Sequence, residues 1–280
     1  MNFEKVKAYI QLSRPINLLI TVISIPVACW IAGGTKDDWF SILFAALTGV
    51  FVAAGANSIN DAFDIDIDRI NRPNRPLPRG TLTPQNAREM WFLVSSGAII
   101  FNFFLNVAAF VIVVIVVVIL YYYSAKLKRT VFLGNFVVAI MTGMAFVYGG
   151  IVMNNIERSI MPALFAFLSN LARELVKDVE DIEGDRREHA LTLPITFGVK
   201  PALWLATISL LILIGSTLLA VYFSIYHIAF LYTVIGADAL ILSAIVMMWH
   251  SASPIQMRRV SISIKMSMGI GLAAIILGSI

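Results

Sequence analysis

The sequence predicts an all-α, multi-pass membrane protein with nine transmembrane helices and a cytoplasmic N-terminus. Three observations lead to this prediction. The mean hydropathy is +0.85, and 59% of the 280 residues are hydrophobic. Several apolar runs reach the length of about 18 residues that a membrane-spanning helix requires. The basic residues fall almost entirely between alternate apolar runs, as expected when cytoplasmic loops carry the positive charge.

The predicted spans follow one another with polar connections. In chain order they occupy residues 15–33, 39–60, 88–106, 108–124, 131–152, 160–178, 200–222, 226–249 and 262–280. No small-residue cleavage site follows the first segment, so we interpret it as a span and not as a cleaved signal. The single cysteine, Cys29, lies in this segment and is expected to pack as a small apolar side chain.

Residues 88–124 are too long for one span of roughly 20 residues. They contain no charged side chain from Met90 to Ser124, and we predict that a turn near Asn106 divides them. With this turn, all of the 21 Lys and Arg residues except Lys36 and Arg158 lie in predicted cytoplasmic regions. Those regions are the N-terminus and residues 61–88, 125–130, 173–200 and 250–265. The net charge of +4 therefore suits an anionic membrane face or an anionic ligand, and no nucleic-acid partner is expected.

Acidic residues gather in two clusters at the same predicted membrane face, and the first lies at 61–68. On a helix, Asn60, Asp64 and Asp68 follow i,i+4 steps and form one stripe, which Asp61 flanks and from which Asp66 points away. Like charges at this spacing repel one another, so the stripe favours a bound cation. Mg²⁺ takes oxygen ligands and bridges carboxylates to phosphates, which makes it the expected cofactor.

The second acidic cluster lies at 174–188. Glu174, Asp178 and Asp181 share a helix face, and we expect Gly184 to end that helix and leave Asp185 on the loop beyond it. A single charged cluster is most simply explained as a solvated loop. Two clusters with helical carboxylate spacing at one face instead favour a site that holds metal ions and a diphosphate between them.

Two basic groups complete the candidate site. Arg72, Arg75 and Arg79 follow the first cluster in a proline-rich, non-helical loop, where their guanidinium groups could contact phosphate oxygens or anchor lipid headgroups. Tyr123 and Lys126 stand at i,i+3 and could face the same cavity, where Lys126 would neutralise a leaving phosphate. Tyrosines in such a position also occur simply as part of an interfacial aromatic belt.

These residues resemble the motifs of the UbiA superfamily of intramembrane prenyltransferases. The stretch "NDAFDIDID" is similar to its N-D-x-x-D-x-x-x-D motif, "DIEGD" to its second aspartate motif, and "YSAK" to the tyrosine–lysine element between them. The resemblance covers nearly the whole chain, so we expect residues 1–280 to form a single transmembrane domain with its helices around a central cavity. Within the superfamily, "INRPNRPLPRG" and "ARELVKDVEDIEGD" are most similar to the archaeal digeranylgeranylglyceryl phosphate synthases.

The resemblance implies roles for these residues in a reaction of geranylgeranyl diphosphate. Mg²⁺ would be held by Asn60, Asp64, Asp68, Asp181 and Asp185, and the four aspartates together with Lys126 would be the catalytic residues. Metal and lysine would offset the charge that builds on the departing diphosphate. The residues expected to support substrate binding are Asp61, Asp178 and Tyr123.

The resemblance also implies an acceptor, geranylgeranylglyceryl phosphate, whose free hydroxyl would become an ether. Arg72, Arg75 and Arg79 would bind its phosphate, and an aspartate of the clusters or His189 would serve as a general base. An aromatic prenyltransferase of quinone or chlorophyll-type biosynthesis would keep both motifs and differ in its acceptor pocket.

A secondary transporter is the alternative from another class. Transporters place substrate groups near the bilayer midplane, whereas here the charge lies at one face and only Asp238 is deep. An ionisable residue at that depth indicates either a functional site or a hydrogen-bonded contact between helices, and the sequence leaves both open. Membrane lipids are expected to surround the protein, and the sequence carries no information about its oligomeric state.

Overall fold

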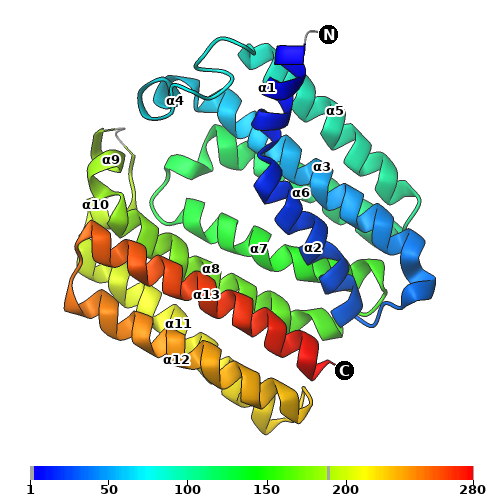
Figure 1. Ribbon diagram of the computed structural model, residues 1–280, viewed down its shortest axis with the longest axis vertical. Coiled ribbons are helices and arrows are strands. Elements are labelled where there is room, and N and C mark those ends of the chain that lie inside the picture. Colours follow the sequence, from blue (N-terminus) through cyan, green and yellow to red (C-terminus); the bar gives the residue numbers. More distant parts are fainter. Residues whose placement is uncertain (1–2, 188–189, 280) are drawn as a thin grey trace. The chain divides into compact units, whose positions relative to one another are not determined.

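The computed structural model describes residues 3–187 and 190–279, and in this part of the chain every regular element is a helix and none is a strand (Figure 1). Nine long helices coincide with the nine predicted segments. They are α2 (Pro15–Ile31), α3 (Trp39–Phe63), α5 (Pro84–Phe103), α6 (Val107–Ala125), α7 (Leu133–Val152), α8 (Glu157–Glu180), α11 (Val199–Tyr222), α12 (Ile228–His250) and α13 (Pro254–Gly278). The shorter elements are α1 (Phe3–Ser13), η1 (Lys36–Asp38), α4 (Ile65–Asn71), η2 (Leu127–Arg129), α9 (Ile182–Arg187) and α10 (Leu193–Phe197).

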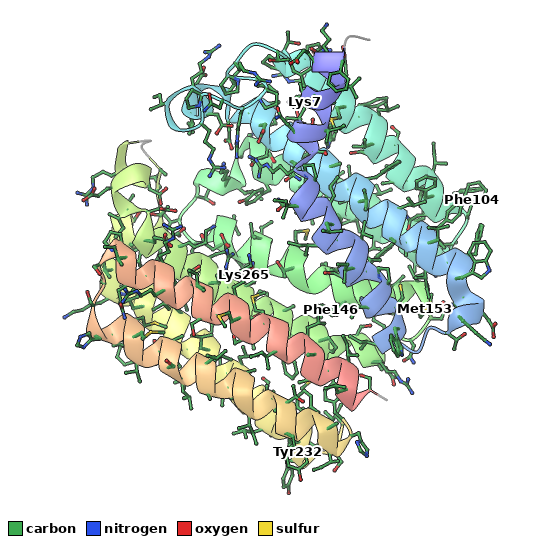
Figure 2. The ribbon with its side chains drawn as sticks, in the orientation of Figure 1. Lys7, Phe104, Phe146, Met153, Tyr232 and Lys265 are labelled. Carbon is green, nitrogen blue, oxygen red and sulfur yellow. The ribbon has the colours of Figure 1, made fainter. Side chains whose placement is uncertain are left out.

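The described helices are those of an integral membrane protein. Seven of them (α3 extended by η1, α6, α7, α8, α11, α12 and α13) are long and apolar enough to cross a membrane. Helices α1 and α2, bent by 52° relative to each other, would together form an eighth span, while α5 is not among the candidates. The ninth span and the cytoplasmic N-terminus therefore remain predictions. Large apolar side chains such as Phe104 and Tyr232 project outward, as expected for a surface covered by lipid (Figure 2).

The chain divides into two compact units, each with its own packing. The first comprises the chain up to Leu127 together with Val147–Glu157, and the second comprises Lys128–Phe146 and the chain from Arg158 onward. In the first unit α3 packs against α1, α2, α5 and α6. In the second unit α12 packs against both α11 and α13. The boundary passes through α7, whose two ends belong to different units.

A polar network joins three helices of the first unit. The buried Asn102 of α5 donates from Nδ2 to Thr48 Oγ1 of α3 at 2.8 Å and accepts at Oδ1 from the Tyr148 hydroxyl of α7 at 2.7 Å. Such hydrogen bonds between helices satisfy polar groups that lipid cannot. Close packing adds to them, because a Cβ atom on Gly149 of α7 would lie only 2.7 Å from the backbone of Ala28 in α2.

The predicted turn near Asn106 is confirmed. Asn106 is the N-cap of α6: its Oδ1 accepts from the backbone N–H of Ala109 at 2.7 Å, and its Nδ2 donates to the carbonyl of Ile151 at 3.0 Å. An asparagine cap of this kind starts a new helix because it supplies an acceptor for an otherwise unpaired N–H group. The expectation for Cys29 is also confirmed, since its side chain is completely buried.

Two helices begin at least four residues earlier than expected. Helix α5 starts at Pro84, after a capping box in which Thr83 and Asn86 exchange hydrogen bonds, and not at residue 88. Helix α13 starts at Pro254, after the N-cap Ser253, and not at residue 262. Arg258, Arg259 and Lys265 consequently lie on a helix and not in a loop (Lys265 is labelled in Figure 2). In both cases the Thr-Pro or Ser-Pro pair is a helix start signal that hydropathy alone overlooks.

Candidate active site

The first acidic cluster lies where α3 bends into the short helix α4. Asp64 separates the two helices, yet hydrogen bonds from Asp64 N to Asn60 O (3.0 Å) and from Asp68 N to Asp64 O (2.8 Å) keep the helical spacing. Asn60, Asp64 and Asp68 therefore form the stripe that the sequence predicts. The two aspartates are buried, whereas Asp66 points away from the stripe, is 86% exposed, and pairs with Arg69.

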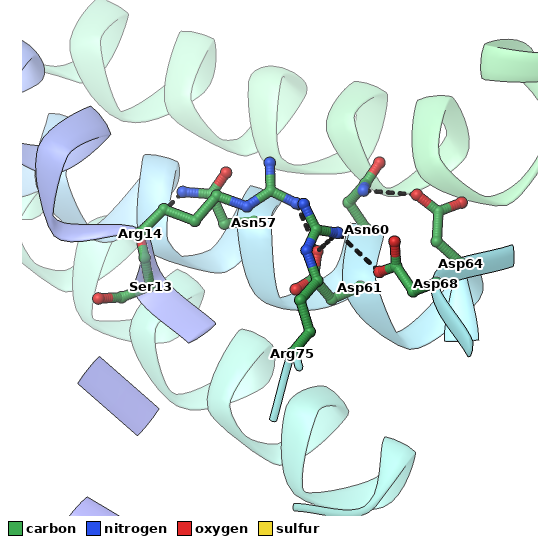
Figure 3. A network of polar contacts seen from close by, with 8 residues as sticks. All are labelled: Ser13, Arg14, Asn57, Asn60, Asp61, Asp64, Asp68 and Arg75. Atoms are coloured by element: carbon green, nitrogen blue, oxygen red, sulfur yellow. Dashed lines mark hydrogen bonds and ion pairs between the residues drawn. The ribbon is translucent and has the colours of Figure 1, made fainter. Parts of the chain in front are cut away.

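Two arginines neutralise this cluster. Arg75 Nη1 lies 2.6 Å from Asp68 Oδ2 and 3.2 Å from Asp61 Oδ1, and Arg14 Nη2 lies 2.5 Å from the same Asp61 oxygen (Figure 3). The carboxylates of Asp61 and Asp68 are only 5% and 7% exposed. A buried carboxylate is tolerated when a counter-charge with good geometry accompanies it. Asp61 is therefore a structural member of the cluster that holds two cationic side chains in place.

The backbone at Arg14 is bent to make this contact. Arg14 occupies the break between α1 and α2 with φ 56° and ψ 75°, a left-handed conformation that non-glycine residues adopt only at a cost. The break is fixed on its other side by Asn57 of α3, whose Nδ2 donates to the carbonyl of Ser13 at 2.9 Å (Figure 3). The surrounding contacts thus stabilise a strained residue that carries a guanidinium to Asp61.

The donor set of the first cluster suits a hard cation. Asn60 Nδ2 donates to Asp64 Oδ2 at 2.7 Å, which leaves the Asn60 amide oxygen as a further oxygen ligand beside two buried carboxylates (Figure 3). Amide and carboxylate oxygens are the ligands that Mg²⁺ prefers. Within residues 3–187 and 190–279 no three Asp, Glu, His or Cys side chains converge on one point. In the first cluster the arginine Arg75, and not a third carboxylate, joins Asp61 to Asp68.

The arginine loop is anchored on a small apolar core. Its Leu77 and the following Leu82 are buried against residues of α1, α3 and α5, which are Ala8, Leu12, Ala62 and Ala87. The loop is non-helical, as predicted, and turns through backbone hydrogen bonds such as Arg79 N to Arg75 O at 3.0 Å. The three predicted phosphate ligands separate into two groups: Arg75 points inward to the aspartates, whereas Arg72 and Arg79 are exposed.

An open pocket of about 340 Å³ lies over this loop. It is lined by Gln11 of α1 and by the loop residues Arg72, Pro73, Asn74, Arg75 and Pro76. Arg79, by contrast, turns its Nε to Thr81 Oγ1 at 3.0 Å. Of the predicted phosphate ligands, Arg72 and Arg75 therefore border the pocket.

The tyrosine–lysine element lies at the same end of the first unit as the first cluster. Tyr121 of α6 contacts the ring of Phe63, the residue before Asp64, with ring centroids 5.7 Å apart. Helix α6 then ends, and Lys126 is its exposed C-cap residue, while Tyr123 is half-buried. The structure thus brings the chain segment that carries Tyr123 and Lys126 next to the end of α3.

The second acidic cluster has the same backbone design as the first. Helix α8 ends at Glu180, Asp181 forms the turn, and α9 follows, with hydrogen bonds from Asp181 N to Lys177 O and from Asp185 N to Asp181 O, both 2.9 Å. The prediction that Gly184 ends the helix is wrong. The helix breaks three residues earlier, and the bond from Asp185 to Asp181 carries α9 across the glycine, which a helix tolerates at a cost of about 1 kcal/mol. Asp185 is therefore on a helix and not on a loop.

Neutral and local partners surround the second cluster. Asp178 accepts from Asn135 Nδ2 of α7 at 2.8 Å. Glu174 accepts from Arg173 at 2.9 Å and from Lys177 at 3.3 Å on its own helix. Asp181 is exposed and Asp185 is half-buried. The acids of this cluster thus lie closer to solvent than those of the first.

Two further candidate residues are Asp238, which the structure describes, and His189, which it does not. Asp238 makes an interhelical contact: its Oδ2 lies 2.8 Å from Thr217 Oγ1 of α11, while its buried Oδ1 has no hydrogen-bond partner. This confirms the structural alternative for Asp238, in which a polar contact joins α11 to α12. His189, a predicted candidate base, lies outside the described residues.

Sequence patterns missed three residues that hold the clusters in place. Arg14 and Asn57 fix the break beside Asp61, and Asn135 binds Asp178. Arg14 could have been noticed as a basic residue between two helices and directly before a proline. Nothing local marks Asn57 or Asn135, because each acts on a residue more than 40 positions away in the chain.

Comparison with known proteins agrees with these motifs. The sequence model of the UbiA prenyltransferase family matches residues 18–268. The digeranylgeranylglyceryl phosphate synthase of Methanosphaera stadtmanae is 35% identical over 273 residues, which cover 97% of this chain and 99% of that protein. A solved structure of a digeranylgeranylglyceryl phosphate synthase superimposes with a TM-score of 0.88 at 33% identity and covers 99% of both chains. A UbiA homologue from Archaeoglobus fulgidus, solved with dimethylallyl diphosphate (DMAPP) and Mg²⁺ bound, has a TM-score of 0.65 at 20% identity and covers 95% of this chain and 98% of its own.

Proposed function

Because the chain belongs to the UbiA prenyltransferase family, we propose that it transfers a geranylgeranyl group from geranylgeranyl diphosphate to the free hydroxyl of geranylgeranylglyceryl phosphate. The observation that carries this proposal is the similarity, over nearly the full length of both chains, to digeranylgeranylglyceryl phosphate synthases. The acidic clusters and the arginine loop supply the charged groups that two phosphorylated substrates require.

The reaction exchanges one carbon–oxygen bond for another. The bond between the allylic carbon and the diphosphate breaks, and its electron pair leaves with the diphosphate oxygen. The acceptor hydroxyl oxygen bonds to the allylic carbon, and the hydroxyl proton passes to a base, for which an aspartate of the clusters is the candidate. The products are an ether lipid of the archaeal type and diphosphate.

Mg²⁺ is the proposed cofactor, and the residues proposed to hold it are Asn60, Asp64, Asp68, Asp181 and Asp185. When bound, it supplies positive charge that stabilises the departing diphosphate. The fold precedent is the Archaeoglobus fulgidus homologue, which was solved with Mg²⁺ and DMAPP. We propose that residues 1–280 act as one catalytic domain.

The remaining residues bind the substrates or hold the neighbouring parts of the protein in place. Lys126, exposed at the end of α6, offsets charge on the leaving diphosphate, and Tyr123 lies on the same helix end. Asp61 holds Arg14 and Arg75 in place through its two ion pairs. Asp178 orients the end of α8 through its bond to Asn135.

The acceptor phosphate binds at the arginine loop. Arg72 borders an open pocket, and Arg79 is exposed nearby on the same loop, so both present guanidinium groups to an incoming phosphate. Arg75 also borders this pocket, but it is already paired with Asp61 and Asp68. We therefore assign Arg72 and Arg79 to the acceptor, and Arg75 mainly to the support of the aspartates.

The proposed topology places this chemistry at the cytoplasmic face of the cell membrane. Nine spans and a cytoplasmic N-terminus put both acidic clusters and nearly all basic residues on one side. Accessibility of single cysteines, introduced at position 70 of α4 and at position 186 of α9, to a membrane-impermeant thiol reagent in oriented vesicles tests this arrangement. Labelling of the two positions from opposite sides would contradict it.

Turnover of the purified protein in detergent tests the function itself. With Mg²⁺ and geranylgeranyl diphosphate, we expect diphosphate release and a labelled ether only when geranylgeranylglyceryl phosphate is present. The control acceptor is 4-hydroxybenzoate, which an aromatic prenyltransferase would use. Product with the control acceptor alone would identify an aromatic prenyltransferase, and no diphosphate release with either acceptor would refute the enzyme assignment.

A further inference from the structure

A stretch of α8 contains two buried hydrogen-bond donors without partners. Asn170 is only 7% exposed, and its Nδ2 has no hydrogen-bond partner among the described residues. One helical turn further along, Arg173 has a buried Nε that is likewise unpartnered. Neither atom belongs to the acidic motifs, and both lie within a helix that is long and apolar enough to cross the membrane.

The neighbouring polar groups on α8 are satisfied. The hydroxyl of Ser169 donates to the carbonyl of Phe165 at 2.7 Å. Glu174 accepts from the other end of the Arg173 guanidinium and from Lys177. Asp178 accepts from Asn135. Glu174 and Asp178 are the acceptors among these groups, and no acceptor of the described residues lies within hydrogen-bonding reach of Asn170 Nδ2 or Arg173 Nε.

The two unpartnered atoms, Asn170 Nδ2 and Arg173 Nε, are both hydrogen-bond donors, and this defines the partner that is missing. An amide NH₂ group and a guanidinium Nε–H donate hydrogen bonds and accept none, so the partner must be an acceptor. Residues at i and i+3 lie on the same side of a helix, with their Cβ atoms roughly 5–6 Å apart. A polar group left unpaired within a membrane-spanning segment is costly, and such groups are rare unless they serve a function. An oxyanion satisfies a guanidinium and an amide together.

We propose that Asn170 and Arg173 form an oxyanion subsite that receives phosphate oxygens of a prenylated substrate. This inference rests on the proposed function, because that function supplies two substrates in which a phosphate is attached to a long apolar chain. Asn170 precedes Asp181 by 11 residues, or about 16 Å along the helix axis. The subsite is therefore separate from the acidic motif and lies deeper along α8.

The two phosphate sources are the diphosphate of the donor and the phosphate of the acceptor. The proposed function otherwise assigns the first to the acidic clusters and the second to the arginine loop, and for the substrate that binds here this subsite would replace that assignment. The chemistry of the subsite is the same for both, and affinity measurements distinguish them. The variants are Asn170→Leu, which keeps the volume and removes the donor, and Arg173→Lys, which keeps the charge and removes Nε. The matched controls on α8 are Ser169→Ala, which removes a satisfied hydroxyl next to Asn170, and Arg158→Gln, which removes an exposed arginine at the other end of the helix.

The first measurement is thermal unfolding of the full-length protein in detergent without ligand. Removing an unpaired buried polar group does not destabilise a protein, so Asn170→Leu is expected to have a Tm equal to or above that of the wild type. The second measurement is binding of geranylgeranyl diphosphate and of geranylgeranylglyceryl phosphate separately. Geranylgeraniol, which carries no phosphate, serves as the control ligand for the apolar chain.

We expect both variants to weaken the binding of one phosphorylated substrate about tenfold, with a matching rise in its KM and a change in kcat of about twofold or less. Binding of geranylgeraniol and of the other substrate should stay at the wild-type level, as should all binding by the two control variants. The substrate that is weakened identifies the phosphate source.

Two results would overturn the subsite. One is unchanged affinity for both phosphorylated substrates in both variants. The other is a lowered ligand-free Tm of Asn170→Leu together with unchanged affinities, which would make Asn170 a packing residue. The proposed function fails separately, if the wild type binds both substrates but forms no ether. Either of the two results above, obtained while the wild type forms the ether, would remove the subsite and leave the function in place.

Discussion

The two acidic clusters share one backbone design but differ in how their charge is balanced. In each, a long helix breaks at an aspartate, a second aspartate stands three residues before the break, and a third stands four residues after it. These are Asp61, Asp64 and Asp68 in the first cluster and Asp178, Asp181 and Asp185 in the second. At the first position Asp61 meets two arginines, whereas Asp178 meets the neutral amide of Asn135.

The difference shows that the same motif can be held together in two ways. Distant arginines stabilise the first cluster, and its three aspartates are buried. The second cluster keeps Asp181 exposed and is fixed mainly through the helix that carries it. The first cluster is therefore preorganised by ion pairs, and the second has more to gain from a bound cation.

The largest effect is expected from the aspartates at the two helix breaks. Asp64→Ala and Asp181→Ala should each reduce turnover by about a thousandfold or more, because each removes a proposed metal ligand that no neighbour replaces. Asp66→Ala is the matched control, since Asp66 lies in the same segment but is exposed and points away from the stripe. The measurement is diphosphate release by protein that has a wild-type elution profile in size-exclusion chromatography. Retained activity in either variant would show that one cluster suffices.

Variants of the two supporting aspartates, Asp61 and Asp178, should differ in the stability of the protein and not only in its activity. Asp61→Asn leaves Arg14 and Arg75 without their shared counter-charge, and since both arginines are partly exposed we expect a loss of about 1–3 kcal/mol. Asp178→Asn replaces a carboxylate that faces an amide, so the free energy of unfolding should change by about 0.5 kcal/mol or less. Unfolding by sodium dodecyl sulfate in mixed micelles measures both. Equal losses would mean that the arginine pairs do not distinguish the clusters.

The positions of the helices were predictable, whereas the partners of the acids were not. Hydropathy and the charge pattern place all nine long helices, and Asn106 marks the turn between two of them, because membrane spans and caps are local properties of the chain. The i,i+4 stripe from Asn60 to Asp68 is local as well. The Arg14–Asp61 pair joins residues 47 positions apart, and only the packing of the break between α1 and α2 against α3 creates it. Gly184 was misinterpreted for a related reason, since its effect depends on a helix break at Asp181 that its own identity does not reveal.

Metal addition should affect the two clusters to different extents. Asp68 is already paired with Arg75, whereas Asp181 is exposed, so Mg²⁺ should order α9 more than α4. In hydrogen–deuterium exchange we expect Mg²⁺ to slow exchange in α9 about tenfold and in α4 about twofold or less. Chelation of the metal should reverse both changes. The control is Asp181→Asn, which should lose the effect in α9 and keep that in α4; equal protection in the wild type would contradict the comparison.

The smallest expected effect concerns Arg72 and Arg79, the two exposed arginines of the loop. Their variants test whether these residues act differently from Arg75, which faces inward. Arg72→Gln and Arg79→Gln should each raise the KM for geranylgeranylglyceryl phosphate about three- to tenfold, because each removes one charged phosphate contact. The stability of these two variants should be unchanged, since neither arginine forms an ion pair within the described part of the chain. Arg75→Gln should instead lower stability, because it leaves Asp61 and Asp68 with less compensation. Steady-state kinetics with each substrate varied in turn, combined with unfolding measurements, separates phosphate binding from support of the aspartates. A raised KM for geranylgeranyl diphosphate in Arg72→Gln or Arg79→Gln would show that these arginines bind the donor and not the acceptor.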